Sequence, residues 1–535
     1  MASESQSEWS KLAAQAKEKR DGAIPVEWRL SSSQLPAGGT LDVTKFPQEC
    51  GLLSEVELDI TDSFATDILT AIKDVKWTSE QVVRAFCKRA AIAQQVTNCL
   101  TVIMFEEAID QAKKLDEHLK KTGKTIGLLH GLPISLKDCM NVTGKPSSVG
   151  FSAWALVPMK SDAVLVSTLR ELGAIPFVKT NLPMSMMCPD TVNNCYGRTV
   201  NPRNRELTPG GSSGGESALI AMHGSVLGVG TDIGGSVRIP ASCTGIFALR
   251  PSHGRIPHSE ERTPLAGLES VYSVAGPMGR SISDLQLFCS SVISTQPWLR
   301  DPKCLPIPWR KVDMPSKLKI GVLEHNGEVT PTPPVKYALD ASVAALKRAG
   351  HEVRSWDASD YAEAVQILLK FFDADGGKGI KAAAEPVGEP LIPGIESYTL
   401  GSDRPTSEMW RLQMQRTELS KRMLDRWGDI DCILGPVSPY VAPKHGQFRS
   451  FAYTGVYNLL DYSSVSFPTG FVADRDRDIY PSDFKPCSKT DKQTWAEYDP
   501  NAVHGMGINL QLVGRQLEEE KVLNMTQQVL QALRM

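Results

Sequence analysis

The sequence predicts an α/β fold with a substantial β-sheet, and three observations lead to this prediction. After Gly131, short apolar runs alternate with stretches of helical periodicity, which is typical of strands that are joined through helices. A second strand–helix–strand pattern follows residue 300. Hydrophobic residues make up 41% and charged residues 22% of the 535 residues, so the chain can bury a large core.

The first 60 residues are predicted to form an appendage of one helix and a loop. Residues 9–19 have a helical pattern, and residues 30–50 are rich in Ser, Pro and Gly, which favours a loop across the surface. Residues 61–535 are predicted to form a single large domain. It begins with a helical region, because residues 63–121 have a helical pattern without Gly or Pro.

Strands and helices alternate through the middle of the chain. The first predicted strand ends at Lys137, and the first helix after it is closed by Gly173, a residue type that favours helix ends. The predicted strands are residues 133–136, 174–178, 226–229 and 246–249, and the predicted helices are residues 161–172 and 216–223.

The unit after residue 300 continues the alternation. A strand-like segment, residues 319–323, precedes an amphipathic helix over residues 335–349 and a second strand over residues 351–356. This unit either continues the sheet or forms a second lobe. The remaining predictions are polar loops over residues 374–405 and 473–502, a strand over residues 508–513 and a helix from residue 518.

Composition excludes several classes of function. The formal net charge is only −3, which gives no electrostatic reason to expect nucleic acid or an anionic membrane as a partner. No apolar run is long enough for a membrane span. The polar N-terminus lacks the apolar region of a signal peptide, so a cytoplasmic location is expected.

The cysteines and histidines give no case for a metal site. The eleven cysteines form no CxxC pair, and free buried thiols are expected in a chain without an export signal. The nine histidines show no HExxH motif. We therefore predict neither a metal nor a cofactor.

Residues 205–240 differ in composition from the rest of the chain. They contain two Gly-Gly-Ser turns, whose serines, Ser212 and Ser236, are 24 residues apart. Glycines let the backbone take positive φ and let a ligand approach closely. Successive N–H groups in such a turn can converge on one oxygen as an anion nest or oxyanion hole. Each serine would then lie beside those donors.

Other interpretations of the glycines remain open. The phosphate-binding motif GxxxxGK[ST] is only half present, since Gly123 and Lys124 follow a His at position 118. The dinucleotide motif GxGxxG begins at Gly228 but has Ile233 in place of its last glycine. The turns can also be ordinary glycine-rich connections without a ligand.

Residues 211–215 also match GxSxG, the nucleophile elbow of α/β-hydrolases. That motif must follow a strand, and residues 201–209 contain two prolines and several polar residues, which form strands poorly. The elbow would further need a downstream histidine, for which His504 is the candidate.

A hydrolase built on serine needs a base, and Lys137 is a candidate. It stands at the end of a predicted strand, before Asp138. A lysine in that position is commonly a solvated loop residue. If it is buried, desolvation lowers its pKa and lets it act as a base near neutral pH.

Three segments together resemble the amidase signature family. They are the segment 131–138, which reads GLPISLKD, the turn 210–216, which reads GGSSGGE, and the turn 230–240, which reads GTDIGGSVRIP. The signature core spans about residues 130–255, and weaker likeness extends to the end of the chain. The chain looks most like fungal acetamidases and general amidases, and its Ser-Ser-Gly-Gly-Glu turn also resembles the fatty-acid amide hydrolases of animals. The resemblance implies the amidase signature fold, a large mixed sheet flanked by many helices.

The resemblance also implies a catalytic mechanism. Ser236 would be the nucleophile, Ser212 would link it to the base Lys137, and the Gly211–Ser212 peptide would be cis. The implied substrate-binding residues are Met186, Ser212 and the turn Ile233, Gly234, Gly235 and Ser236, whose N–H groups would hold the oxyanion. Asp232 and Arg238 would hold the turn, and Tyr457, Asn458 and Asp461 would line the far side of the pocket.

The function implied is that of a serine amidohydrolase. It would convert a small aliphatic or aryl carboxamide to a carboxylic acid and ammonia or an amine through an acyl-enzyme. The alternatives are a fatty-acid-amide- or carbamate-hydrolysing member, an amidotransferase subunit that needs partners, and a scaffold without catalysis. The expected partner is a small-molecule amide, and a homodimer is possible. Specificity is expected from residues 300–310, 370–400 and 440–465, where Phe371, Phe372 and Trp410 offer an apolar wall.

Overall fold

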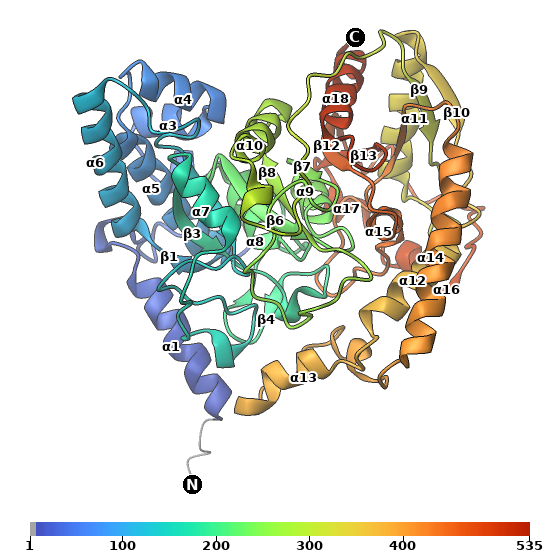
Figure 1. The fold of residues 1–535 in the computed structure, drawn as a ribbon, viewed down its shortest axis with the longest axis horizontal. Coiled ribbons are helices and arrows are strands. Elements are labelled where there is room, and N and C mark those ends of the chain that lie inside the picture. Colours follow the sequence, from blue (N-terminus) through green and yellow to red (C-terminus); the bar gives the residue numbers. More distant parts are fainter. Residues whose placement is uncertain (1–6) are drawn as a thin grey trace.

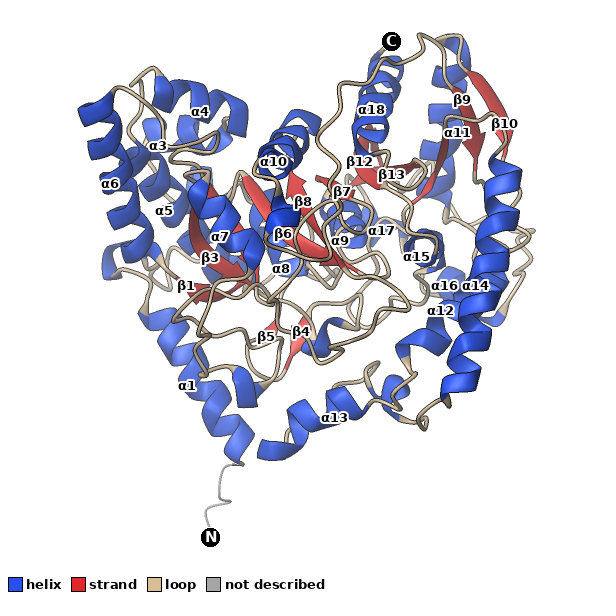
Figure 2. Ribbon diagram, in the orientation of Figure 1, coloured by secondary structure: helices blue, strands red, loops and turns tan. Residues whose placement is uncertain are grey.

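A mixed sheet of eleven strands runs through the computed structural model, which describes residues 7–535, and helices surround it (Figures 1 and 2). This confirms the predicted α/β fold. In chain order the strands of the sheet are β1 (Leu100–Ile103), β2 (Pro133–Lys137), β3 (Ile175–Thr180), β6 (Leu227–Asp232), β7 (Phe247–Arg250), β8 (Val274–Gly279), β9 (Lys319–Val322), β10 (Glu352–Ser355), β11 (Cys432–Pro436), β12 (Ser464–Val472) and β13 (Gly507–Val513). A separate two-stranded ribbon is formed by β4 (Val192–Asn193) and β5 (Gly197–Arg198).

The strand order is β1-β3-β2-β6-β8-β7-β12-β13-β11-β9-β10. Strand β2 is parallel to its neighbours β3 and β6, and β9 is parallel to β10 and β11. The remaining neighbours within the sheet are antiparallel. Because β9 and β10 close one end of this sheet, the unit after residue 300 continues the sheet and is not a second lobe.

Helices flank the sheet along its length, and the edge strand β10 lies largely exposed at the outside of the molecule (Figure 2). From the N-terminus to the middle of the chain they are α1 (Glu8–Gly22), α2 (Phe46–Glu49), α3 (Glu55–Asp62), α4 (Ala65–Lys73), α5 (Ser79–Thr97), α6 (Phe105–Thr122), α7 (Val164–Glu171), α8 (Gly214–Ala221), α9 (Arg238–Thr244) and α10 (Ile282–Ser294). The rest are α11 (Pro333–Arg348), α12 (Tyr361–Phe372), α13 (Lys378–Ala384), α14 (Thr406–Trp427), α15 (Ala452–Leu459), α16 (Lys489–Ala496), α17 (Pro500–Val503) and α18 (Glu519–Arg534).

Most predicted elements are present, but the continuous helical region over residues 63–121 is wrong in one place. Residues 100–103 form β1, which pairs antiparallel with β3 at one edge of the sheet. Asn98, with a left-handed backbone, ends α5 just before this strand. An apolar run of only four residues is too short to show whether its periodicity is that of a helix or of a strand. Its pairing with β3 makes it a strand. The predicted loops 374–405 and 473–502 also contain short helices, namely α13 in the first and α16 and α17 in the second.

The N-terminal segment packs onto the rest of the chain. Ile24, Trp28 and Val43 are buried and belong to the main hydrophobic core. Within residues 7–535, no helix combines the length and the apolar character that a bilayer crossing requires.

Three adjacent strands position the glycine-rich turns. Strands β3, β2 and β6 are parallel neighbours, so their carboxyl ends lie at the same edge of the sheet. Lys137 is the last residue of β2, and Asp232 is the last residue of β6. The first turn leads into α8 and the second into α9, and both helices lie near the middle of the molecule (Figure 1). Ligands commonly bind at such an edge of an α/β sheet.

Candidate active site

Lys137 is fully buried at the carboxyl end of β2. Its Nζ lies 2.6 Å from Ser212 Oγ and 2.8 Å from Thr231 Oγ1. Burial lowers the pKa of Lys137 to about 8, although nearby acidic groups act in the opposite direction. A lysine in this state is partly neutral near physiological pH and can accept a proton.

The two serines lie on turns that are tied together. The Gly211–Ser212 peptide is cis, and Ser212 is buried. The Ser213 N–H donates to the Ser236 carbonyl oxygen at 3.1 Å, which links the first turn to the second. Ser236 is partly exposed and, with Ser212, lines one cavity. The fold therefore brings Lys137, Ser212 and Ser236 to one place.

Asp232 holds the second turn in shape. Its carboxylate accepts hydrogen bonds from the N–H groups of Gly235 at 2.7 Å and Val237 at 3.2 Å. It forms a buried ion pair with Arg238, and Asn458 Nδ2 donates to it at 2.8 Å. Burial would raise the pKa of Asp232, but the Arg238 charge and these hydrogen bonds keep it well below its usual range. Asp232 and Arg238 are thus structural, whereas Asn458 lies beneath the turn and not on the wall of the pocket.

The Gly234–Gly235 peptide is fixed at both of its polar atoms. The Thr454 hydroxyl, from α15, donates to the Gly234 carbonyl oxygen at 2.7 Å, and the Gly235 N–H is occupied by Asp232. Gly235 has φ of +132°, and a Cβ there would lie 2.3 Å from Thr454 Oγ1, so only glycine fits.

This geometry corrects one expected oxyanion donor. The N–H of Gly235 is committed to Asp232. The N–H groups of Ile233, Gly234 and Ser236 have no hydrogen-bond partner within residues 7–535. They are the donors that remain for an oxyanion.

Two cavities of different character meet at Ser236. The polar arm, of about 280 Å³, also contains Ser212 and Thr231. The apolar arm, of about 40 Å³, contains Gly211 and Gly234. Met186 and Ile233 line both arms. Three aromatic residues from distant segments close the apolar arm: Phe372, Tyr398 and Phe451.

The expected specificity regions do contribute to these walls. Phe372 and Tyr398 lie in residues 370–400, Phe451 lies in residues 440–465, and Lys303 lies in residues 300–310. Two of the proposed aromatic residues do not: Phe371 is in the core, and Trp410 is 67% exposed on α14. Tyr457 is also buried in the core, and Asp461 pairs with Arg250.

One wall of the polar arm was not anticipated from the sequence. Residues 258–263 and 265–268 line it, together with the stacked rings of His253 and Tyr272, whose centroids are 3.8 Å apart. This segment belongs to none of the motifs that the sequence analysis identified. Thr231 and Thr454 were missed for a different reason, because their roles depend on contacts between distant segments.

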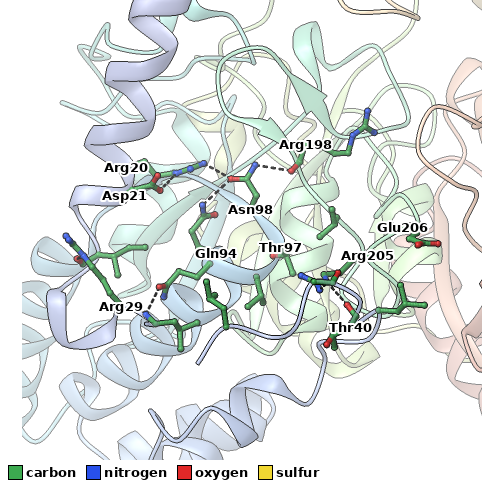
Figure 3. Close-up of a pocket in the computed structure, with 18 of the residues that line it drawn as sticks. Arg20, Asp21, Arg29, Thr40, Gln94, Thr97, Asn98, Arg198, Arg205 and Glu206 are labelled. Atoms are coloured by element: carbon green, nitrogen blue, oxygen red, sulfur yellow. Dashed lines mark hydrogen bonds and ion pairs between the residues drawn. The ribbon is translucent and has the colours of Figure 1, made fainter. Parts of the chain in front are cut away.

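A larger cavity, of about 990 Å³, lies between the N-terminal segment and the end of α5 (Figure 3). Several of its charged side chains are already engaged. Arg20 bonds with Asp21 and Asn98, and Arg205 donates to the Thr40 carbonyl oxygen. Lys137, Ser212 and Ser236 do not line this larger cavity, so we place the candidate active site at Ser236.

The elbow interpretation does not fit the structure. Residues 201–209, before the first turn, form only isolated bridges and no strand. The central serine of the match, Ser213, is buried with its hydroxyl near the Thr231 backbone. His504 is exposed and accepts a hydrogen bond from the Arg475 N–H.

All eleven cysteines are free thiols.

Comparisons with known proteins cover nearly the whole chain. A family model described as Amidase matches residues 81–523. The chain is 40% identical over 539 residues to an acetamidase of Emericella nidulans, with 97% of each chain covered. It is 38% identical over 540 residues to an acetamidase of Aspergillus oryzae, covering 97% of this chain and 98% of that one. A solved structure titled fatty acid amide hydrolase superposes with a TM-score of 0.95 at 33% identity, covering 99% of this chain and 95% of that one.

Proposed function

The chain belongs to the amidase signature family and is an amide-hydrolysing enzyme, and on that premise we propose that it is a serine amidase for short-chain carboxamides. The observation that carries the proposal is the 2.6 Å contact between Lys137 Nζ and Ser212 Oγ, beside a partly exposed Ser236. A buried lysine with a lowered pKa can act as a base. A serine between this lysine and the cavity can relay the proton.

In the proposed mechanism, Ser236 Oγ attacks the amide carbon while its proton passes through Ser212 Oγ to Lys137 Nζ. The negative oxygen of the tetrahedral intermediate binds the N–H groups of Ile233, Gly234 and Ser236. Each such donor is worth about 3–4 kcal/mol of transition-state stabilisation. Lys137 returns the proton through Ser212 to the leaving nitrogen, the C–N bond breaks, and water then hydrolyses the acyl-enzyme.

We expect the two arms of the cavity to hold the two halves of the substrate. The leaving nitrogen must face Ser212, which supplies its proton, and Ser212 lines only the polar arm. The acyl group then lies in the apolar arm, which at about 40 Å³ is much the smaller of the two. The enzyme would therefore prefer short acyl groups, and the larger polar arm could take a substituent on nitrogen.

The experiment measures ammonia release by the purified protein from acetamide, propionamide, hexanamide and phenylacetamide. We expect ammonia from the shorter amides, and a mass increase equal to the acyl group on the peptide that contains Ser236 after acid quenching. If the purified protein releases ammonia from none of these amides, either alone or with added cell extract, the proposal is contradicted. Release only with extract would favour the amidotransferase alternative.

The length of the acyl group should depend on Phe372. Its ring packs against Tyr398 and Phe451, with centroids 6.3 Å away in each case. Phe372→Ala should open the apolar arm and raise the ratio of kcat/KM for hexanamide to that for acetamide by at least about tenfold. Trp410→Ala, which removes an exposed aromatic ring from α14, is the control and should leave the ratio unchanged. An unchanged ratio in Phe372→Ala would place the acyl group elsewhere.

The pH dependence should follow the proton on Lys137. The base works only in its neutral form, and the pKa of Lys137 is lowered by burial to about 8. We expect kcat/KM to rise with pH, with a midpoint near 8, and to reach a plateau above it. A rate that falls through this range would show that the protonated lysine is the required form.

A further inference from the structure

Glu216 is a buried carboxyl near Lys137 that the proposed mechanism does not use. It lies in the first turn of α8 and has no exposed surface. Its two oxygens accept hydrogen bonds from Ser135 Oγ and, at 2.7 Å, from Thr180 Oγ1. No cationic side chain within residues 7–535 forms an ion pair with it at hydrogen-bond distance.

The hydrogen bonds of Glu216 place it on the same face of the sheet as Lys137. Ser135 and Lys137 are two residues apart on β2, so their side chains point to the same face. Thr180, the other donor, is the register partner of Lys137 on β3. Glu216 is therefore bound to the two residues that flank Lys137, one along its strand and one across to the next strand.

Gly228 provides the room that this carboxyl occupies. It lies on β6, where it pairs in register with Ser135. A Cβ at position 228 would lie 1.8 Å from Glu216 Oε1. The absence of a side chain there lets the carboxyl sit against the sheet between β2 and β6.

Most other acidic groups around Lys137 are paired or neutral. Asp232 pairs with Arg238 and Asp138 with Lys179, whereas the neighbour of Glu261 is His258, which is a cation only when it is protonated. Burial raises the pKa of the Cys139 thiol, next to Lys137, and of the Cys99 thiol, near Glu216, to about 12, so both are neutral. Glu216 and Glu261 therefore both act on Lys137 without a permanent cation of their own, and Glu216 is the one bound to the two residues that flank Lys137.

We propose that Glu216 is a positioning residue that serves as the internal counter-charge of Lys137 during proton relay. When the proton of Ser236 reaches Lys137 Nζ, a buried ammonium forms, and the Glu216 carboxylate across the sheet face balances it. No bond to Glu216 forms or breaks, and the proton leaves again with the amine. The inference rests on the proposed function, because it requires Lys137 to be the base.

The ionisation of the two groups is compatible with this role. Burial raises the pKa of Glu216 to about 7 and lowers that of Lys137 to about 8. Between these values the pair carries one negative and one positive charge. Without the carboxylate, the ammonium would be less stable, and Lys137 would lose its proton at a lower pH.

The test is the pH profile of kcat/KM for Glu216→Gln, which keeps the shape of the side chain. We expect the midpoint of the acid limb to move to lower pH by about one unit. At pH 7, kcat/KM as a fraction of its plateau should then rise about fivefold. Thr180→Val, which removes a donor to Glu216 without changing the volume, should move the midpoint in the same direction by a smaller amount, and it keeps the test valid if Glu216→Gln does not fold.

A matched control is Asp284→Asn, which neutralises another buried carboxyl. Asp284 lies on α10, its pKa is raised by burial to about 6, and it accepts from the Ala65 N–H. Its profile should match that of the wild type. If Ser236→Ala is inactive but the midpoints of Glu216→Gln and Thr180→Val equal that of the wild type, the counter-charge is excluded while the proposed function stands. If Ser236→Ala keeps full activity, the proposed function itself fails.

Discussion

Ser236→Ala is expected to lower kcat by about 10⁴-fold or more while the protein stays folded, because the variant loses the atom that attacks the amide. Ser236 is partly exposed on its turn and its side chain makes no hydrogen bond that the fold needs within residues 7–535. The turn itself is held by Asp232 and Thr454. The thermal unfolding midpoint should therefore change little. Amide binding should persist, since the cavity and the oxyanion donors remain.

Ser213→Ala is the matched control for this substitution. Ser213 is the neighbour of Ser212 and the central serine of the GxSxG match, but it lines neither arm of the cavity. Its replacement should cost much less activity than that of Ser236. Full loss in Ser213→Ala and His504→Ala, with an active Ser236→Ala, would contradict the scheme and support a nucleophile elbow.

The parts of the site that were predictable lie within short segments of sequence. The two glycine–serine turns and Lys137 each belong to a motif of seven to eleven residues, and the spacing between motifs identifies the family. The fold then has only to bring the carboxyl ends of β2 and β6 together, which neighbouring parallel strands do. For the same reason the roles assigned to Asp232 and Arg238 agree with their hydrogen bonds.

The parts that were not predictable depend on contacts between distant segments. Thr454 reaches the second turn from α15, across 220 positions of sequence. Phe372 and Trp410 are both aromatic residues in helices, yet Phe372 lines the cavity and Trp410 faces solvent. Neither the composition nor the periodicity of the sequence shows which face of each helix lies toward the cavity. Strand β8, with the sequence VAGPMG, has residues that disfavour strands, and its position between β6 and β7 outweighs them.

Lys137→Met should also be severe, with a loss of about 10²–10⁴-fold in kcat, the range that general acid–base catalysis contributes. Methionine fills most of the buried volume, so the variant should fold, whereas alanine would leave a cavity beneath Ser212. The loss has two sources. Nothing accepts the proton of Ser236 in the first step, and nothing donates a proton to the leaving nitrogen.

The double variant, Lys137→Met with Ser236→Ala, tests whether the two residues act as one catalytic unit or contribute independently to kcat. If the two residues act as one unit, the double variant should be little slower than Ser236→Ala alone, because the lysine has no function once the nucleophile is absent. If the two losses multiply, Lys137 must contribute to something besides the nucleophile, such as substrate binding. The measurement is kcat on acetamide at pH 9, above the pKa of Lys137 of about 8, where the wild-type base is neutral and its protonation state does not limit the comparison.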